Sequence, residues 1–432
     1  MVWLAGVGYG QTVAPAVLKN SAAGAVNRFY RVVPSGLSWC DTGEKASDLR
    51  RALLDAVDSA AFFGLDRRDY LPDLLQWADS MLRAGQVHAQ WRDWDRWYTE
   101  AALAFARDLY EGAGVRERLS YDGVSGSYTV RDDQYLAEGL ARVGSGAGLR
   151  GWMADLVPDG PGYRVMRDSL AGYLAVARDS VRALRTQASV RVARLGQAMN
   201  ALRWVDHFHF DRRIVVSIAS AELRYYQGDS LRLRMKVVVG EPSKRTPRFA
   251  AWCDGVVLYP YWNVPHKIAA RELLPLFKLT PTVAASMEFQ VVDSRGRQVD
   301  PSKLPWASYT AANFPYQVRQ APGCFNALGV IRFNINSPFD VYMHDTNTKE
   351  AFASAYRYYS HGCIRLERPI DLGVALLDDH LDTTFLKSCF KDQRPIPVTL
   401  DKAVPVFVLY STVGVAPSGK LTWYKDVYHL DN

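Results

Sequence analysis

Apolar residues recur at helical spacing in the first half of the chain. One stripe occupies positions i, i+4, i+7, i+8 and i+11 and consists of Leu49, Leu53, Ala56, Val57 and Ala60. This spacing predicts an amphipathic helix whose apolar face packs against a neighbouring element. Ser47 is the expected N-cap of this helix, and Gly64 is expected to end it.

The same period continues almost to residue 200. Residues 98–109 and 135–143 predict further helices, and glycine-containing breaks separate them. A last helix, rich in Ala and Arg, is expected over residues 168–194. The first half of the chain therefore indicates a helical scaffold over residues 1–210.

From residue 211 onward the pattern becomes that of short β-strands. Residues 214–218, 223–226 and 231–240 are β-rich, and a turn at 227–229 predicts that they form an antiparallel meander. Further strands are expected at residues 255–259, 329–335, 340–343 and 404–410. The two halves together predict the α+β fold class, with a helical scaffold followed by a mostly antiparallel β domain.

Residues 266–321 interrupt the β pattern. They open with a helical stretch at 269–277 and are longer than a strand connection needs, so we interpret them as an insertion over a site. Their apolar stripe needs a partner surface and consists of Leu273, Leu274, Leu276 and Phe277. Two interpretations stay open, a mobile lid and a fixed satellite core.

Composition and charge narrow the class of protein. The 432 residues are 48% hydrophobic and 22% charged, which predicts two or three globular units and excludes a disordered or collagen-like chain. The net charge of +7 is spread along the chain, so a nucleic acid partner is not expected, whereas an anionic polymer such as bacterial cell wall is compatible. No apolar run approaches the roughly 20 residues that cross a bilayer.

The residues suited to catalysis lie between His344 and Arg365. The chain has 5 cysteines, an odd number, so at least one is free or pairs between chains. Cys363 follows His361 and Gly362, and His344 lies upstream. An imidazole that takes the thiol proton makes a strong nucleophile, and a glycine lets backbone N–H groups approach a substrate carbonyl. This combination suggests acyl transfer.

These residues allow two other interpretations. Cys363 is in the first a small buried hydrophobe, with structural histidines around it, because cysteine is among the most often buried residues. In the second, His344, His361 and Cys363 bind zinc. Neither a CxxC nor an HExxH motif accompanies them, and His361 and Cys363 are too close in sequence for a usual ligand pair, so no metal is expected.

The neighbourhood of Cys363 favours catalysis. Residues 360–365 read Ser-His-Gly-Cys-Ile-Arg and follow the segment Tyr-Met-His-Asp-Thr at 342–346. This string resembles the signature of the L,D-transpeptidase (YkuD-type) catalytic domain. Segments at 239–242, 260–265 and 322–329 are similar to other signature segments of the large periplasmic branch of that family. The helical half and the C-terminal end of the chain also resemble this branch.

The resemblance implies a role for each matching residue. Cys363 would be the nucleophile and His344 its general base, oriented by the backbone carbonyl of Asp345. The N–H groups of Gly362 and Cys363 would hold the oxyanion together with the hydroxyl of Tyr342. The residues expected to shape the substrate pocket and its entrance are Ser360, His361, Arg365, Trp262 and Asn263.

The resemblance also implies the division of the chain. The scaffold of residues 1–210 would precede a catalytic β-sandwich domain at 211–385, capped by residues 266–321, and a C-terminal segment at 386–432 would pack on both. The branch commonly carries a peptidoglycan-binding module in its helical half. Here only about twenty residues, 176–195, stand at that place, so the module is expected to be absent.

The implied activity is peptidoglycan L,D-transpeptidation without a cofactor. Cys363 would attack the third-residue carbonyl of a tetrapeptide stem, and an acceptor stem amine would resolve the thioester to a 3-3 or 1-3 cross-link. The alternatives are L,D-carboxypeptidation, D-amino-acid exchange, or a non-catalytic wall-binding scaffold. Carbapenems are the expected inhibitors. The small-residue run at 14–16 resembles the end of an export signal, and the expected location is the periplasm.

Overall fold

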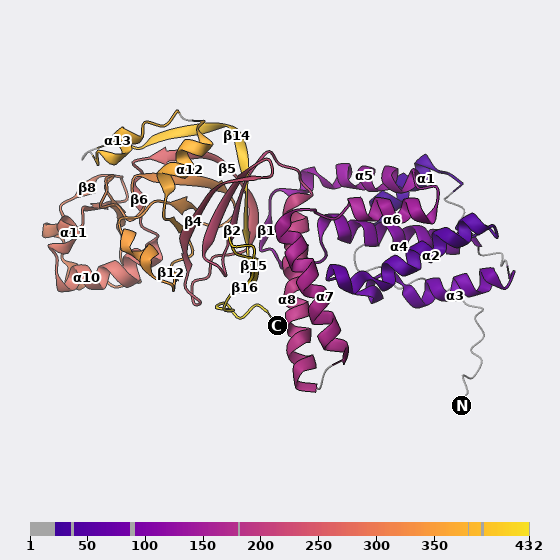
Figure 1. The fold of residues 1–432 in the computed structure, drawn as a ribbon. Helices are drawn as coiled ribbons and strands as arrows, with labels where there is room; N and C mark the ends of the chain where they lie inside the picture. Colours follow the sequence, from indigo (N-terminus) through magenta and orange to yellow (C-terminus); the bar gives the residue numbers. More distant parts are fainter. Residues whose placement is uncertain are drawn as a thin grey trace. The chain divides into compact units, whose positions relative to one another are not determined.

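The fold consists of two compact units (Figure 1). The structure, a computed structural model, describes residues 22–35, 39–86, 91–179, 182–378, 380–389 and 393–431. The first unit contains the described residues up to Val115, then Ser127–Phe208 and Val413–Trp423. The second contains Arg116–Gly126, His209–Thr412 and the described residues from Tyr424 onward. The suspected signal-cleavage segment at 14–16 lies outside the described residues.

The first unit is helical. Its helices are α1 (Ala23–Val32), α2 (Glu44–Asp58), α3 (Pro72–Arg83), α4 (Trp91–Glu111), α5 (Thr129–Ala141), α6 (Gly146–Asp155), α7 (Pro161–Asp179) and α8 (Arg182–Asp206). Helix α4 contributes most to the core, because residues such as Trp94, Tyr98 and Phe105 are buried on several of its faces. Each large apolar side chain buried in this way contributes roughly 1.5–3 kcal/mol to folding.

The first predicted helix has different ends from those expected. Helix α2 begins at Glu44 with Gly43 at its N-cap position, so the expectation of Ser47 as N-cap is wrong. The buried stripe starts at Ala46, which places Ser47 inside the first turn. Helix α2 ends at Asp58, and a 3₁₀ turn follows to Gly64. Gly64 has φ +66°, and a Cβ there would lie 2.4 Å from Gly196 Cα, so only glycine fits.

The predicted long helix at 168–194 is instead two helices, α7 and α8, which pack against each other. The apolar residues that join them include Met166, Leu170, Leu195 and Met199. Because these positions recur at helical spacing in both segments, they read as one continuous helix in the sequence, although they belong to two helices that pack together.

The second unit is built on one large, mostly antiparallel sheet in the order β1-β5-β10-β11-β13-β4-β3-β2-β14. Strand β14 also pairs with β5, so the pairing closes into a ring, and β12 pairs with β4. The predicted α+β class is confirmed. The strands are β1 (Tyr121–Asp122), β2 (Arg212–Ser217), β3 (Glu222–Gln227), β4 (Ser230–Gly240), β5 (Phe249–Leu258), β10 (Ile331–Asn336), β11 (Met343–His344), β12 (Tyr358–Ser360), β13 (Ile364–Leu366) and β14 (Ile396–Leu409).

Residues 266–321 and the preceding strand β6 form a subdomain of the second unit, here called the insertion. Its elements are β6 (Trp262–Asn263), α9 (His266–Ile268), a π-helical turn (Ala269–Leu273), α10 (Leu274–Leu279), α11 (Val283–Ser286), β7 (Phe289–Val292), β8 (Gln298–Val299) and β9 (Gln317–Gln320). Its strands form a separate sheet in the order β6-β9-β7-β8. Phe277, Phe289 and Trp306 belong to its own apolar core. Leu273, Leu274 and Phe277 of the predicted stripe pack in this core, whereas Leu276 is exposed.

The two units cut across the predicted division of the chain in two places. Residues 116–126 belong to the second unit because β1 pairs in parallel with β5. Residues 413–423 belong to the first, because the hairpin of β15 (Val413–Val415) and β16 (Leu421–Trp423) packs with α7 and α8. A disulfide joins Cys324 to Cys389 within the second unit. No helix in the described ranges has the length and apolar character of a membrane span.

Candidate active site

Three short strands place five functional side chains on one face of the large sheet. Strand β11 pairs in parallel with β13, with Met343 opposite Ile364, and antiparallel with β10, with Arg332 opposite His344. The residues between these positions, such as Phe333 and Ile364, belong to the apolar core. Because side chains alternate along a strand, the opposite face carries the polar set. This set is Arg332, His344 and Arg365 of the strands, together with Tyr342 and Cys363, which directly precede β11 and β13.

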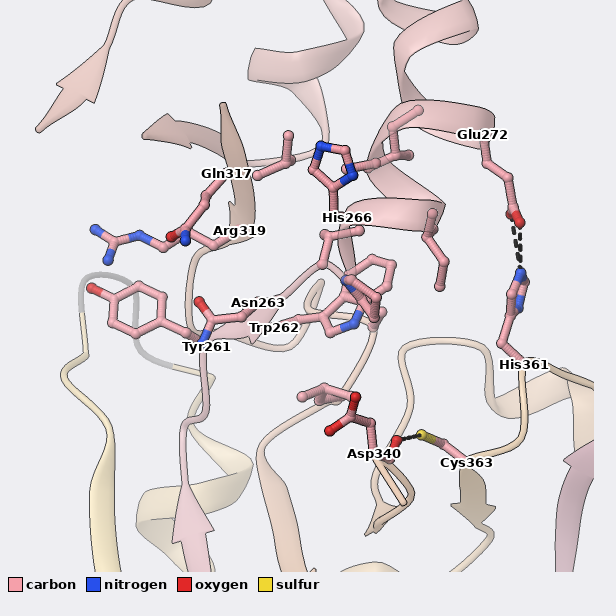
Figure 2. Close-up of a pocket in the computed structure, with 18 of the residues that line it drawn as sticks. Tyr261, Trp262, Asn263, His266, Glu272, Gln317, Arg319, Asp340, His361 and Cys363 are labelled. Atoms are coloured by element: carbon pink, nitrogen blue, oxygen red, sulfur yellow. Dashed lines mark hydrogen bonds and ion pairs between the residues drawn. The ribbon is translucent and has the colours of Figure 1, made fainter. Parts of the chain in front are cut away.

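A cavity of about 790 Å³ lies over this face and is lined by all five side chains. Its other wall comes from the insertion, and Figure 2 shows both walls. Insertion residues that line it include Trp262, Asn263, His266, Glu272 and Arg319. This segment therefore lines the cavity that Cys363 also lines, and its role as a cap stays a prediction. Whether the segment moves stays a prediction.

The loop before Cys363 is held by its own hydrogen bonds. Ser360 Oγ donates to the Cys363 carbonyl at 2.6 Å and accepts from the Gly362 N–H at 3.1 Å. Thr246 Oγ1 donates to the Gly362 carbonyl at 2.8 Å. Gly362 has φ +116°, a conformation that favours glycine. Ser360 thus braces the loop in addition to lining the cavity, and the thiol is presented from a fixed backbone.

The thiol of Cys363 points at a backbone carbonyl. Its Sγ lies 3.6 Å from the Asp340 carbonyl oxygen (Figure 2). Burial raises the pKa of the Cys363 thiol, although the Tyr342 N–H and the charge of Arg365 act in the opposite direction. The resting group is therefore a thiol, and it needs a base to become a nucleophile.

His344 has the geometry of such a base. It is 4% exposed, and its Nδ1–H donates to the backbone carbonyl of Asp345, which leaves Nε2 as the proton acceptor. Burial, with Arg365 nearby, lowers the pKa of His344 to about 3, so the ring is neutral at physiological pH. This is the arrangement expected for His344 and the Asp345 carbonyl from the sequence.

The Asp345 side chain has a second task that the sequence did not suggest. Its carboxylate accepts from the Val330 N–H at 3.0 Å and from the Thr346 N–H at 2.7 Å, and it pairs with Lys349. A Cβ at Gly329 would lie 2.2 Å from this carboxylate. These bonds fix the backbone whose carbonyl orients His344.

Within the described residues, no hydrogen bond joins His344 to Cys363. The two lie on the same face of neighbouring strands, and the thiol is directed toward Asp340 instead. Proton transfer therefore needs a rotation of the Cys363 side chain toward Nε2. Catalytic hydrogen bonds commonly tighten only when substrate is bound.

Of the predicted oxyanion donors, Tyr342 is ready to donate, whereas the Gly362 N–H already has an acceptor. The hydroxyl of Tyr342 interacts with the Cys363 thiol, and burial raises its pKa, so it keeps the proton that it would donate. The Gly362 N–H already donates to Ser360 Oγ, contrary to the free donor expected from the sequence. The Gly362 N–H would have to break its hydrogen bond to Ser360 Oγ before it could bind an oxyanion. Because Gly362 has no Cβ, a substrate can still approach the thiol.

His361 contacts the insertion. Its Nε2 lies 2.9 Å from a carboxylate oxygen of Glu272 (Figure 2). The same Nε2 lies 2.8 Å from Lys244 Nζ, and Lys244 Nζ lies 3.2 Å from the Glu272 carboxylate. Although partial burial raises the pKa of Glu272, hydrogen bonds from His361 and Lys244 outweigh it and lower that pKa. This group connects the insertion to the cysteine loop.

The two predicted entrance residues line the cavity from the insertion. The Trp262 ring packs against Phe289, with ring centroids 6.1 Å apart. Asn263 lies directly opposite Arg319 in the β6–β9 pair. Arg365 lines the cavity floor, and burial lowers its pKa.

Sequence reasoning missed several residues of this site. Arg332 lies between the apolar residues Ile331 and Phe333 in a strand that was predicted. The alternation of apolar and polar residues could therefore have placed Arg332 on the polar face of that strand. Glu272 and Lys244 gave no signal, because only the tertiary placement of the insertion brings them to His361. No group of three or more His, Cys, Asp or Glu suited to a metal occurs in the described part of the chain.

The chain matches two known domain types in sequence. The profile of the L,D-transpeptidase catalytic domain matches residues 211–373, and that of a scaffold domain matches residues 24–170. Over residues 211–373 the chain is therefore similar in sequence to the L,D-transpeptidase catalytic domain. A Haemophilus influenzae protein named "Putative L,D-transpeptidase" is 35% identical over 239 residues, which are 54% of this chain and 47% of that protein. The chain thus spans about half the length of this relative.

The solved structures that the chain matches at low similarity include two L,D-transpeptidases. One is the L,D-transpeptidase from Mycobacterium smegmatis, at 14% identity and a TM-score of 0.22, covering 46% of this chain and 58% of that one. Another is LdtMt1 in complex with imipenem, at 15% identity and a TM-score of 0.22, covering 46% and 59%.

Proposed function

We propose that this protein is a peptidoglycan L,D-transpeptidase in which Cys363 is the nucleophile. The His344 Nε2 takes the thiol proton, and the sulfur attacks the third-residue carbonyl of a tetrapeptide donor stem. The terminal D-amino acid leaves with the proton from His344, and a thioester remains. An acceptor stem amine then attacks the thioester, and the thiol is released as a 3-3 or 1-3 cross-link forms.

One observation carries this proposal. The strand register puts the thiol, the imidazole, the Tyr342 hydroxyl and Arg365 on one face of the sheet, under a cavity of about 790 Å³. A nucleophile, a neutral base and a protonated donor are the parts that acyl transfer needs. A cysteine that served only for packing would not need a base held by Asp345.

The same site admits water as a second nucleophile, which would give L,D-carboxypeptidation, and a free D-amino acid, which would give exchange. We infer that the insertion favours transpeptidation, because it covers the thioester position and limits access of water. We further propose a periplasmic location, where the stem peptides are found, and inhibition by carbapenems through acylation of Cys363.

Mass spectrometry of muropeptides tests the proposal. Purified protein is added to bacterial sacculi, which are then digested to disaccharide peptides. Cross-linked dimers joined at the third residue of the donor are the expected product. Tripeptide monomers alone would identify a carboxypeptidase, and terminal D-amino-acid replacement would identify an exchanger. An unchanged muropeptide profile would contradict catalysis on this polymer.

A further inference from the structure

Strand β9 presents a polar row to the far end of the cavity. It is flanked by β6 and β7, with Arg319 opposite Asn263 on one side and opposite Gln290 on the other. Val318 is buried in the apolar core of the insertion but also borders the cavity, and the polar Gln317 and Arg319 line the cavity on either side of it. Arg319 is therefore held on a flanked strand and not on a loop.

The guanidinium of Arg319 is held in place by two neighbours. It stacks over the Tyr261 ring, 4.4 Å from the ring centroid, and its Nε donates to Gln290 Oε1 at 2.7 Å. Both contacts leave the two terminal amino groups of the guanidinium unused. In the ranges that the structure describes, Arg319 forms no ion pair. By contrast, Arg297 of the same insertion pairs with Asp293 at 2.8 Å.

This guanidinium lies away from the cysteine. Figure 2 shows Arg319 and Tyr261 on one side of the cavity and Cys363 with His361 on the other. Arg332 and Arg365, on the sheet face beside Cys363, would meet a carboxylate next to the reacting carbonyl. Arg319, at the other end of the cavity, is too far from this position to bind the same carboxylate.

We propose that Arg319, positioned by Tyr261 and Gln290, is a specificity residue that binds a carboxylate of a peptide stem remote from the bond that reacts. The proposal rests on the proposed function, since it names a further contact with the same substrate. Stem peptides carry several carboxylates, and an arginine whose terminal amino groups are free binds one in bidentate fashion. Asn263, opposite Arg319, supplies a polar edge to the same subsite.

Variants of Arg319 with paired substrates test this proposal. Arg319→Met removes the charge, and Arg319→Lys keeps the charge but loses the pair of terminal amino groups that binds a carboxylate in bidentate fashion. Arg295→Met removes one exposed charge from the same insertion and is the control. Each is assayed with tetrapeptide stems that have free side-chain carboxylates and with their carboxamide forms. For the carboxylate form, kcat/KM is expected to fall about 10- to 100-fold in Arg319→Met, less in Arg319→Lys, and not in Arg295→Met.

The comparison with amidated stems separates a direct contact with the carboxylate from a purely structural role of Arg319, because a structural defect would slow the reaction of both forms. Wild type should discriminate against the amidated stems, and Arg319→Met should treat both forms alike. If kcat/KM of Arg319→Met fell equally for both forms of the stem, the proposal would be overturned. It would also be overturned if Arg319→Met reacted with both forms at the wild-type rate. Alkylation of Cys363 by iodoacetamide, a neutral reagent, should be unchanged in Arg319→Met, which shows that the thiol site is intact.

Two half-reactions identify the stem that supplies the carboxylate. Release of the terminal D-amino acid reports donor binding, and transfer from a preformed thioester to an added acceptor reports acceptor binding. A loss in the first step assigns the carboxylate to the donor, and a loss in the second assigns it to the acceptor. If wild type releases no D-amino acid and forms no thioester, the proposed function has failed, which is distinct from failure of the subsite.

Discussion

At the scale of single residues, the central pair lies in the cavity in its uncharged form. His344 is neutral because its buried ring is costly to protonate, and Cys363 is protonated because its thiolate would be buried. The pair therefore differs from a preformed thiolate–imidazolium, and the nucleophile forms when the proton moves to His344.

This resting state predicts how acylation depends on pH. The rate at which a carbapenem acylates Cys363 should rise with pH across about pH 6 to 10, because the thiolate fraction rises toward a pKa that burial has raised. The intact mass of the protein should increase by one drug equivalent, and peptide mapping should place the drug on the peptide with His361–Arg365. A rate that is already maximal at about pH 6 would show a preformed thiolate–imidazolium pair. Labelling at Cys253 would show that Cys363 is not the nucleophile.

His344 also predicts a dependence of stability on pH. Its pKa is about 3 when folded against an ordinary value of 6.5, so the unfolded chain binds a proton that the folded chain does not between these values. Stability should therefore fall as pH decreases through this window, by at most about 1.4 kcal/mol per pH unit from this residue. Urea unfolding of wild type and His344→Asn at two pH values measures the effect. An equal pH dependence in both proteins would contradict the assignment.

At the scale of elements, the short strands β10, β11 and β13 determine the site. The sequence predicted β10 and most of the loop chemistry, because alternation and the string at 360–365 are local signals. Strand β13 was not predicted, since three residues are too few to show a period. Of the insertion residues that line the cavity, Trp262 and Asn263 were predicted from the resemblance, whereas Glu272 and Arg319 were not. The packing that brings Glu272 and Arg319 to the cavity is not encoded at a fixed spacing from Cys363.

The insertion is connected to the cysteine loop through Glu272. This residue belongs to a π-helical turn, a rare conformation that is frequent at functional sites, and it binds His361 and Lys244. Residues 278–305 contain β7, β8 and the core residue Phe289. Their deletion would dismantle the insertion, so a point substitution is the better test of a lid.

Glu272→Gln removes the charge that binds His361 and Lys244. We expect the insertion to cover the thioester less tightly, so hydrolysis should increase relative to transpeptidation by a few fold, with faster hydrogen exchange across 266–279. Glu350→Gln, an exposed charge outside the cavity, is the matched control. Product ratio and exchange that stay at wild-type values in Glu272→Gln would favour a fixed insertion over a lid.

At the scale of the whole molecule, the chain is two units with separate apolar cores. The change of period near residue 211 was enough to predict a helical half and a β half. It was not enough to predict that β1 joins the β unit or that the β15–β16 hairpin joins the helical unit, because both depend on pairing between residues distant in sequence.

The central claim is that Cys363 forms the thioester, and one comparison tests it most directly. Wild type, Cys363→Ala, His344→Ala and the control Cys40→Ala are incubated with a tetrapeptide stem, and products and intact protein are measured by mass spectrometry. Wild type and Cys40→Ala should release the terminal D-amino acid, carry the acyl group on the peptide with Cys363, and yield dimers. Cys363→Ala should lose turnover by at least about 10⁴-fold and His344→Ala by nearly as much, because nucleophile and base act as a unit. Dimers formed by Cys363→Ala at the wild-type rate would contradict the account.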